Sequence, residues 1–130
     1  MSFTESNTPF EALGNEADVR ALVDAFYDRM DSAPDYAGIR AMHAPNLTEA
    51  RDKLYKFLVG WLGGPPLYTQ EFGHPRLRMR HAPFSISESE RDQWLGCMAD
   101  AMNECNITGD LRTFLDQRFA HVANFMRNRS

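Results

Sequence analysis

The sequence predicts an all-α protein. Apolar residues recur at helical spacing in four long segments, and no stretch alternates apolar and polar residues with period two. Clusters of glycine and proline separate the segments. With 130 residues the chain has the length of one domain, so residues 1–130 are expected to form a single domain after an N-terminal extension of about residues 1–9.

The first predicted helix spans residues 16–31. The apolar residues on its main face are Val19, Leu22, Val23, Phe26 and Met30, and Tyr27 lies at the edge of that face. The run SAPD at residues 32–35 ends the helix, and a short segment over residues 36–43 follows.

The second predicted helix begins at a capping box formed by Asn46 and Glu49. Its apolar stripe consists of Leu47, Ala50, Leu54, Phe57, Leu58 and Trp61. The sequence GGPP at residues 63–66 ends the helix, because glycine weakens a helix and proline lacks a backbone donor.

Residues 67–86 are mixed and rich in loops, with one short helix expected to lead up to His81. Ser87 and Glu90 form a second capping box, which opens a third helix running to about Cys105. The last helix follows Gly109 and continues to about Met126. The wide aromatic faces of these helices indicate that something apolar lies between them.

Composition excludes several classes of protein. The net charge of −4 disfavours nucleic acid as a partner, and no apolar run approaches the roughly 20 residues of a membrane span. The N-terminus has neither a basic start nor an apolar run, so we expect a cytoplasmic protein. Cys97 and Cys105 are expected to be reduced core thiols.

The stretch GHPRLRMRHAPF at residues 73–84 concentrates histidine and arginine. His81 is either an ordinary satisfied histidine or a ligand to haem iron, a role for which the apolar residues after it would supply a slot. His74 lies between glycine and proline, which favours a turn. The arginines are either solvated or placed to meet an anion.

Four blocks of sequence carry a resemblance. Residues 26–27 (FY), 61–65 (WLGGP), 73–84 (GHPRLRMRHAPF) and 90–98 (ERDQWLGCM) are similar to the group II truncated haemoglobins, the short globins of bacteria and plants. The similarity covers about residues 10–127. It implies a truncated globin fold, a 2-on-2 α-helical sandwich around one haem b (iron protoporphyrin IX).

The resemblance also implies roles for individual residues. His81 matches the proximal ligand of the haem iron. Tyr27, His43 and Trp94 match the distal positions that stabilise a bound ligand. Further pocket positions are Phe26, Ala50, Leu54, Phe57, Leu58, Leu77, Phe84, Ile86 and Met98. Lys53 matches a basic position that pairs with a haem propionate. Arg80 and Tyr68 are expected to bind the propionates as well, although the residues alone leave open which arginine does so.

The expected function is the binding of O2, and of CO and NO, at a five-coordinate haem iron, because Ala50 cannot coordinate the metal. Hydrogen bonds from the distal side chains would make O2 release slow, which suits scavenging or sensing. The alternative is a redox enzyme with peroxidase-like or NO dioxygenase activity, for which an external electron donor would be required. A monomer or a homodimer is expected, with neither nucleic acid nor membrane as a partner.

Overall fold

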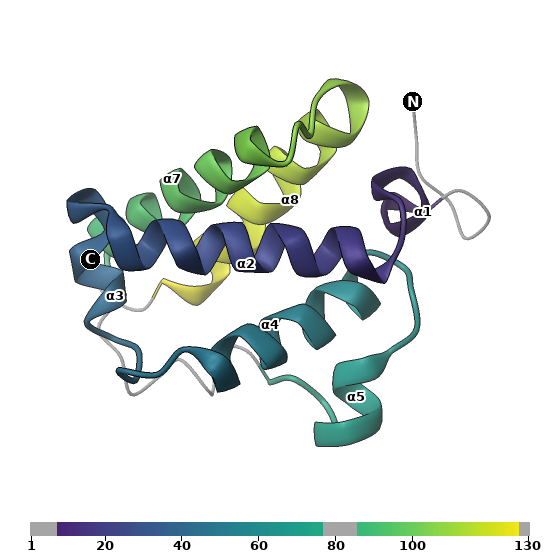
Figure 1. Ribbon diagram of the computed structural model, residues 1–130, viewed down its shortest axis with the longest axis horizontal. Helices are drawn as coiled ribbons and strands as arrows, with labels where there is room; N and C mark the ends of the chain where they lie inside the picture. The colour runs from purple at the N-terminus through teal and green to yellow at the C-terminus, as the bar shows by residue number, and fades with distance from the viewer. Residues whose placement is uncertain (1–7, 77–85, 128–130) are drawn as a thin grey trace.

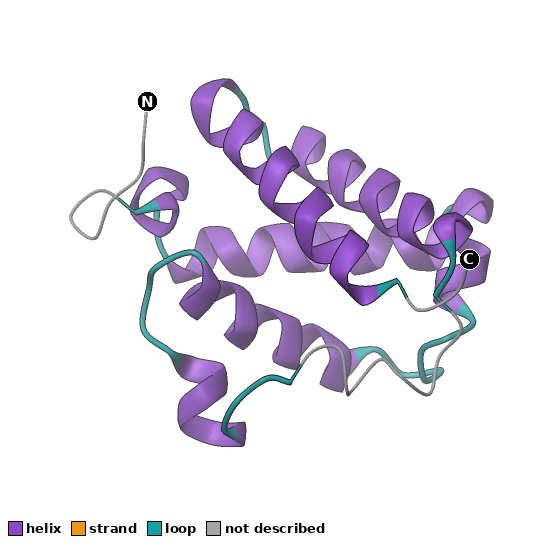
Figure 2. Ribbon diagram, turned by 180° about the vertical axis from the view of Figure 1, so that it is seen from behind, coloured by secondary structure: helices purple, strands orange, loops and turns teal. Residues whose placement is uncertain are grey.

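The computed structural model describes residues 8–76 and 86–127, and every regular element among them is a helix (Figure 2). The α-helices are α1 (Pro9–Leu13), α2 (Glu16–Ser32), α3 (Ala37–Arg40), α4 (Thr48–Trp61), α5 (Leu67–Phe72), α7 (Glu88–Glu104) and α8 (Gly109–Met126). A 3-10 turn, η1 (Pro34–Tyr36), precedes α3. The all-α prediction is confirmed.

Side-chain caps fix where two of the long helices begin. Asn15 caps α2, accepting hydrogen bonds from the backbone N–H groups of Ala17 and Asp18 at 2.9 and 3.3 Å. The predicted box at the start of α7 is present, since the backbone N–H of Ser87 donates to Glu90 Oε1 at 2.8 Å. Both caps satisfy donors that a helix N-terminus otherwise leaves unpaired.

The capping box predicted for α4 is wrong. The helix begins at Thr48, with Leu47 in the cap position, and Asn46 Oδ1 accepts instead from the Thr48 N–H at 2.9 Å. Glu49 lies within the first turn of the helix, where it pairs with Lys53 at 2.7 Å. The Glu49 carboxylate therefore pairs with Lys53, one turn later in the helix, and not with the backbone N–H that a capping box requires.

Helix α2 crosses the molecule and packs against both α4 and α7, and α7 packs against α8 (Figure 1). The α2–α4 and α7–α8 pairs thus form two layers. Their fully buried side chains include Leu22, Phe26, Leu58, Met98 and Leu115. Cys97 and Cys105 are both free thiols, as predicted, but only Cys97 is buried in the core, whereas Cys105 is partly buried at its edge.

Residues 67–76 contain α5, a helix that ends at Phe72, well before His81. His74 lies in the following turn, where its Nδ1 accepts from the backbone N–H of Arg76 at 3.0 Å. The segment next to His81 lies outside the described residues. Within the part of the chain that is described, no helix is long and apolar enough to span a bilayer.

Candidate functional site

A cavity of about 430 Å³ lies between the two helix layers. Its walls come from α2, α3, α4, α5, α7 and α8, and from the turn after α3. This volume is within the range of roughly 300–1,000 Å³ that is usual for a small-molecule or cofactor site. Segments far apart in the sequence therefore meet around one space.

Most of the residues singled out from the sequence line this cavity. They are Tyr27, His43, Ala50, Lys53, Leu54, Phe57, Tyr68, Ile86 and Trp94. Four other predicted site residues, Leu77, Arg80, His81 and Phe84, lie outside the described residues.

Three predicted pocket residues do not form its wall. Phe26, Leu58 and Met98 are at most 1% exposed and lie in the core behind the cavity. Phe26 points about 100° away from Tyr27 around the axis of α2, and its side chain is buried in the core. Phe26 instead supports the wall, because its ring contacts those of Tyr27 and Trp94 at centroid distances of 5.0 and 5.4 Å.

Seven lining residues were not identified from the sequence: Ile39, Met42, Glu90, Arg91, Val122, Ala123 and Met126. Val122 and Met126 lie at helical spacing from the apolar residues Leu115 and Phe119 of the last helix, a pattern that could have indicated them. Glu90 and Arg91 gave no such signal, because a capping residue and its neighbour are ordinarily solvated. Only the packing of α7 brings them to the cavity.

Tyr27 is the most deeply buried polar group in the wall. Its side chain is 5% exposed, and its ring meets the ring of His43 edge-on at 5.7 Å. Burial raises the pKa of Tyr27 well above its ordinary value, an effect that the nearby Arg51 guanidinium partly offsets. The phenol therefore keeps its proton at neutral pH and can donate a hydrogen bond into the cavity.

Trp94 faces the same cavity from α7. Its ring packs against Phe26 and, at 5.6 Å, against Phe119 of α8, so aromatic neighbours hold it from two helices. An indole N–H is a donor only. The α2 and α7 sides of the cavity thus each contribute one donor.

His43 reaches the cavity from the turn after α3. Its Nδ1 lies 2.9 Å from the backbone oxygen of Ile39. Arg40 fixes the following backbone by donating to the carbonyl oxygens of Ala44 and Pro45 at 3.0 and 2.9 Å. The imidazole is therefore held in place by the turn that carries it.

Two cationic side chains lie among the apolar lining residues. Lys53 pairs with Glu49, and its Nζ lies 5.5 Å from the centre of the Phe72 ring. Arg91 donates to Asn124 Oδ1 at 2.8 Å, which ties α7 to α8. Together with the hydroxyl of Tyr68, these groups can bind the anionic substituents of an otherwise apolar molecule.

Comparison with known proteins identifies the family. The bacterial-like globin family matches residues 8–128, nearly the whole chain. The protein is a group II truncated haemoglobin. It is 44% identical over 124 residues to the group 2 truncated haemoglobin YjbI of Bacillus subtilis, a match covering 95% of this chain and 91% of the relative.

Solved structures agree with this membership. The group II 2-on-2 haemoglobin of Agrobacterium tumefaciens superposes with a TM-score of 0.92 and is 42% identical, with 100% of both chains covered. A truncated oxygen-avid haemoglobin from Bacillus subtilis has a TM-score of 0.87 and 45% identity over 94% of this chain and 100% of that one. The predicted 2-on-2 sandwich is confirmed.

Membership of the truncated haemoglobins implies a haem cofactor and haem-based oxygen binding. The cavity fits such a group. Aliphatic and aromatic side chains form most of its wall, which suits an apolar macrocycle, and Lys53 and Arg91 could pair with anionic substituents.

Proposed function

We propose that this truncated haemoglobin holds haem b in the cavity and binds O2, CO and NO there, with tight retention of O2. The single observation that carries the proposal is that two hydrogen-bond donors, Tyr27 and Trp94, line one apolar cavity beside His43. A relative described as oxygen-avid, 45% identical to this chain, supports tight retention.

His81 would hold the haem iron, and Lys53, Tyr68 and Arg80 would bind the propionates. Arg91, which lines the cavity, adds a second described cation for this purpose. When bound, haem b supplies an iron that binds diatomic ligands reversibly. Ala50 lines the cavity without a coordinating atom, so it leaves room for such a ligand.

The protein's own contribution is to hold donors where a ligand gathers negative charge. The Tyr27 hydroxyl and the Trp94 indole N–H are both such donors. A hydrogen bond to a charged acceptor contributes about 1.5–3 kcal/mol, and each 1.4 kcal/mol changes an equilibrium about tenfold. Two such bonds would slow O2 release by orders of magnitude, which suits scavenging or sensing better than delivery.

A redox activity is the second candidate, either peroxidase-like or NO dioxygenase. The presence of His43 in the cavity favours it, because an imidazole can exchange protons with a substrate near neutral pH. An external electron donor would be required for turnover.

The test is the absorption spectrum of the purified protein, followed by O2 binding to its ferrous form. We expect a Soret band, stable O2 binding, and loss of both in His81→Ala. His121→Ala is the matched control, since His121 is an exposed histidine of α8, and it should bind haem normally. Normal haem content in His81→Ala would contradict the assignment of the iron ligand.

A further inference from the structure

We propose that Gln93 is a positioning residue that fixes the tautomer of His43, so that the neutral imidazole serves the cavity as a hydrogen-bond acceptor. The geometry of this inference is independent of the proposed function. Its consequence, the choice of ligand, rests on the proposed function. It replaces the expectation that all three distal side chains are donors.

The tautomer follows from the group that Nδ1 of His43 contacts, the backbone oxygen of Ile39. A carbonyl oxygen only accepts hydrogen bonds, so the 2.9 Å contact between Nδ1 and the Ile39 oxygen requires a proton on Nδ1. A neutral imidazole has one N–H, and the bond made by one ring nitrogen therefore sets the state of the other. Nε2 then carries a lone pair and can accept but not donate.

The Ile39 carbonyl can fix this tautomer only if its own position is fixed. Helix α3 has four residues, too few to be stable alone in water. Gln93 supplies an anchor from α7, because its Oε1 accepts the backbone N–H of Ile39 at 3.2 Å. Gln93 directly precedes Trp94 in α7. One turn of α7 therefore carries both Trp94 and the residue that holds the backbone beside His43.

The contact between Gln93 and α3 depends on a missing side chain. A Cβ atom on Gly38 would lie 2.7 Å from Oε1 and 2.8 Å from Nε2 of Gln93. The amide group therefore occupies the space that any other residue at position 38 would fill. Its Nε2 also donates to Ser89 Oγ at 3.1 Å, which orients the amide with Oε1 toward Ile39.

An acceptor at position 43 selects between classes of ligand. A lone pair repels the negative end of O2 but attracts a small ligand that carries a proton, such as water or hydrogen peroxide. Tyr27 and Trp94 donate, so the cavity offers both kinds of group. We infer that His43 favours protonated small ligands and weakens the hold on O2.

The tautomer can be read directly from the 15N chemical shifts of the His43 ring. We would record these in the purified protein, with CO bound to the ferrous haem and at a pH where the ring is neutral. The expected result is a proton on Nδ1 and none on Nε2. A neutral ring with its proton on Nε2 would overturn the acceptor assignment, and this measurement needs no variant.

Variants of Gln93 test its positioning role. Gln93→Ala should give a mixture of tautomers, whereas Gln93→Glu, which keeps an oxygen to accept the Ile39 N–H, should restore the single one. Gly38→Ala should resemble Gln93→Ala, because it displaces the amide without deleting it. His121→Ala, at an exposed position of α8, is the control and should leave the tautomer as it is. An unchanged single tautomer in Gln93→Ala would overturn the role of Gln93.

The ligand preference is tested by O2 release from His43→Phe. Loss of a repelling lone pair should make release several-fold slower than in the wild type, while loss of a donor would make it faster. Unchanged or faster release overturns the acceptor role in ligand choice. If the protein binds no haem, the proposed function fails, but the tautomer remains readable in the haem-free protein, so the two failures are distinguishable.

Discussion

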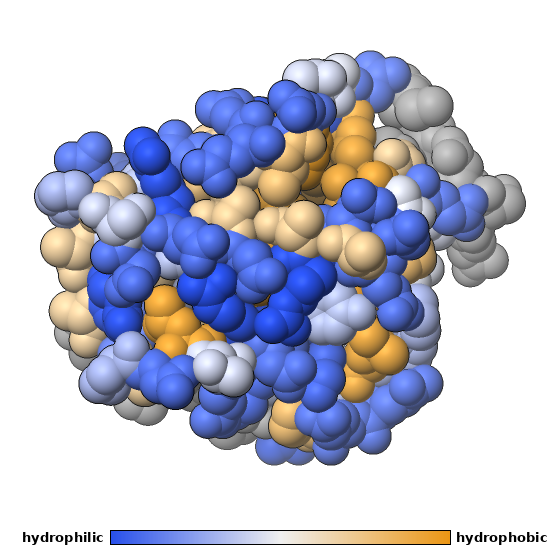
Figure 3. Space-filling view, in the orientation of Figure 1, coloured by the Kyte–Doolittle hydropathy of each residue, from blue (hydrophilic) through white to orange (hydrophobic). Residues whose placement is uncertain are grey.

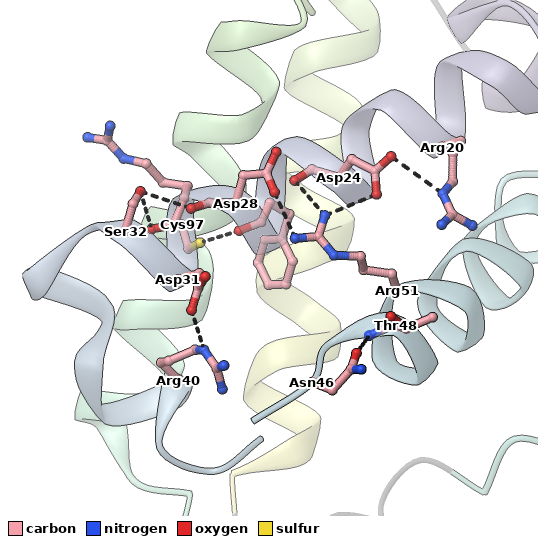
Figure 4. A network of polar contacts seen from close by, with 12 residues as sticks. Arg20, Asp24, Asp28, Asp31, Ser32, Arg40, Asn46, Thr48, Arg51 and Cys97 are labelled. Carbon is pink, nitrogen blue, oxygen red and sulfur yellow. Dashed lines mark hydrogen bonds and ion pairs between the residues drawn. The ribbon is translucent and has the colours of Figure 1, made fainter. Parts of the chain in front are cut away.

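The two sides of the cavity are held together by different kinds of contact. Between α2 and α4, Arg51 bridges Asp24 and Asp28 at 3.1 and 2.7 Å (Figure 4). Its guanidinium carbon also lies 5.8 Å from the centre of the Tyr27 ring. On the α3–α7 side, which includes η1, the Gln93 amide contacts the Ile39 backbone and the Tyr36 hydroxyl of η1 donates to Asp100. The first side relies on charge and the second on fitted hydrogen bonds.

The difference lies in how each side responds to its surroundings. Asp28 and Asp24 are 70% and 41% exposed, and the surface along α2 is mostly hydrophilic (Figure 3). Ion pairs this exposed contribute about 0–1 kcal/mol and weaken in salt. The α3–α7 contacts depend instead on close approach at Gly38 and Gly96, where added side chains would meet Gln93 and Tyr36. They should be insensitive to salt but intolerant of substitution.

The largest expected effects concern the donor that each side presents. Tyr27→Phe and Trp94→Phe should each speed O2 dissociation roughly ten- to a hundredfold, because each removes a hydrogen bond worth about 1.5–3 kcal/mol. Stopped-flow displacement of O2 by CO measures the rates. The double variant shows whether the two donors act independently.

Phe125→Leu is a suitable control for this comparison, because Phe125 is 53% exposed and does not line the cavity. If one of the two donor variants releases O2 at the wild-type rate, retention depends on a single side of the cavity. The expectation that the α2 donor and the α7 donor both slow O2 release would then be wrong.

A smaller effect is expected for Tyr36→Phe on the α3–α7 side. Burial, with the 2.6 Å hydrogen bond to Asp100, raises the pKa of Tyr36 to about 12. A tyrosine in the unfolded chain titrates near pH 10. Tyr36 therefore stabilises the fold fully below about pH 10, and this contribution is lost as the pH rises towards 12.

Urea unfolding across this pH range measures the effect. Tyr36→Phe should lower the free energy of unfolding by about 1 kcal/mol at pH 8 and should show a shallower decline from pH 10 to 12. Declines of equal slope in the variant and the wild type would show that the hydrogen bond to Asp100 does not stabilise the α3–α7 side.

The smallest effect is expected for Arg51→Met on the α2–α4 side. The variant keeps an apolar side chain over Tyr27 but loses both ion pairs. We expect a loss of at most about 1 kcal/mol at low ionic strength that disappears near 1 M salt, where screening acts within about 3 Å. A loss that persists in salt would mean that the guanidinium acts through its contact with the Tyr27 ring.

The long helices were predictable because their apolar stripes extend over several turns. The short elements were not, since α1, η1 and α3 are too brief for periodicity to show. The start of α4 was misplaced for a related reason. A capping pattern at Asn46 does not reveal that Glu49 has a competing partner in Lys53.

The site was predictable where a residue type has a distinctive place in the family, as for Tyr27, His43 and Trp94. Wall residues were harder to assign, because a stripe on a helix does not say which neighbour it faces. Phe26 and Met98 belong to apolar stripes yet lie in the core, while Arg91 belongs to no stripe and lines the cavity. That distinction depends on how α2, α7 and α8 are rotated against one another.

Cys97, one helical turn beyond Trp94, donates its thiol hydrogen to the Phe26 carbonyl at 3.2 Å, and burial raises its pKa to about 12. Oxidants attack the thiolate form of cysteine. Because this sulfur stays protonated and out of contact with solvent, it is chemically silent toward peroxide at neutral pH. The packing that places Phe26 behind the cavity therefore also protects the sulfur of Cys97 from oxidation.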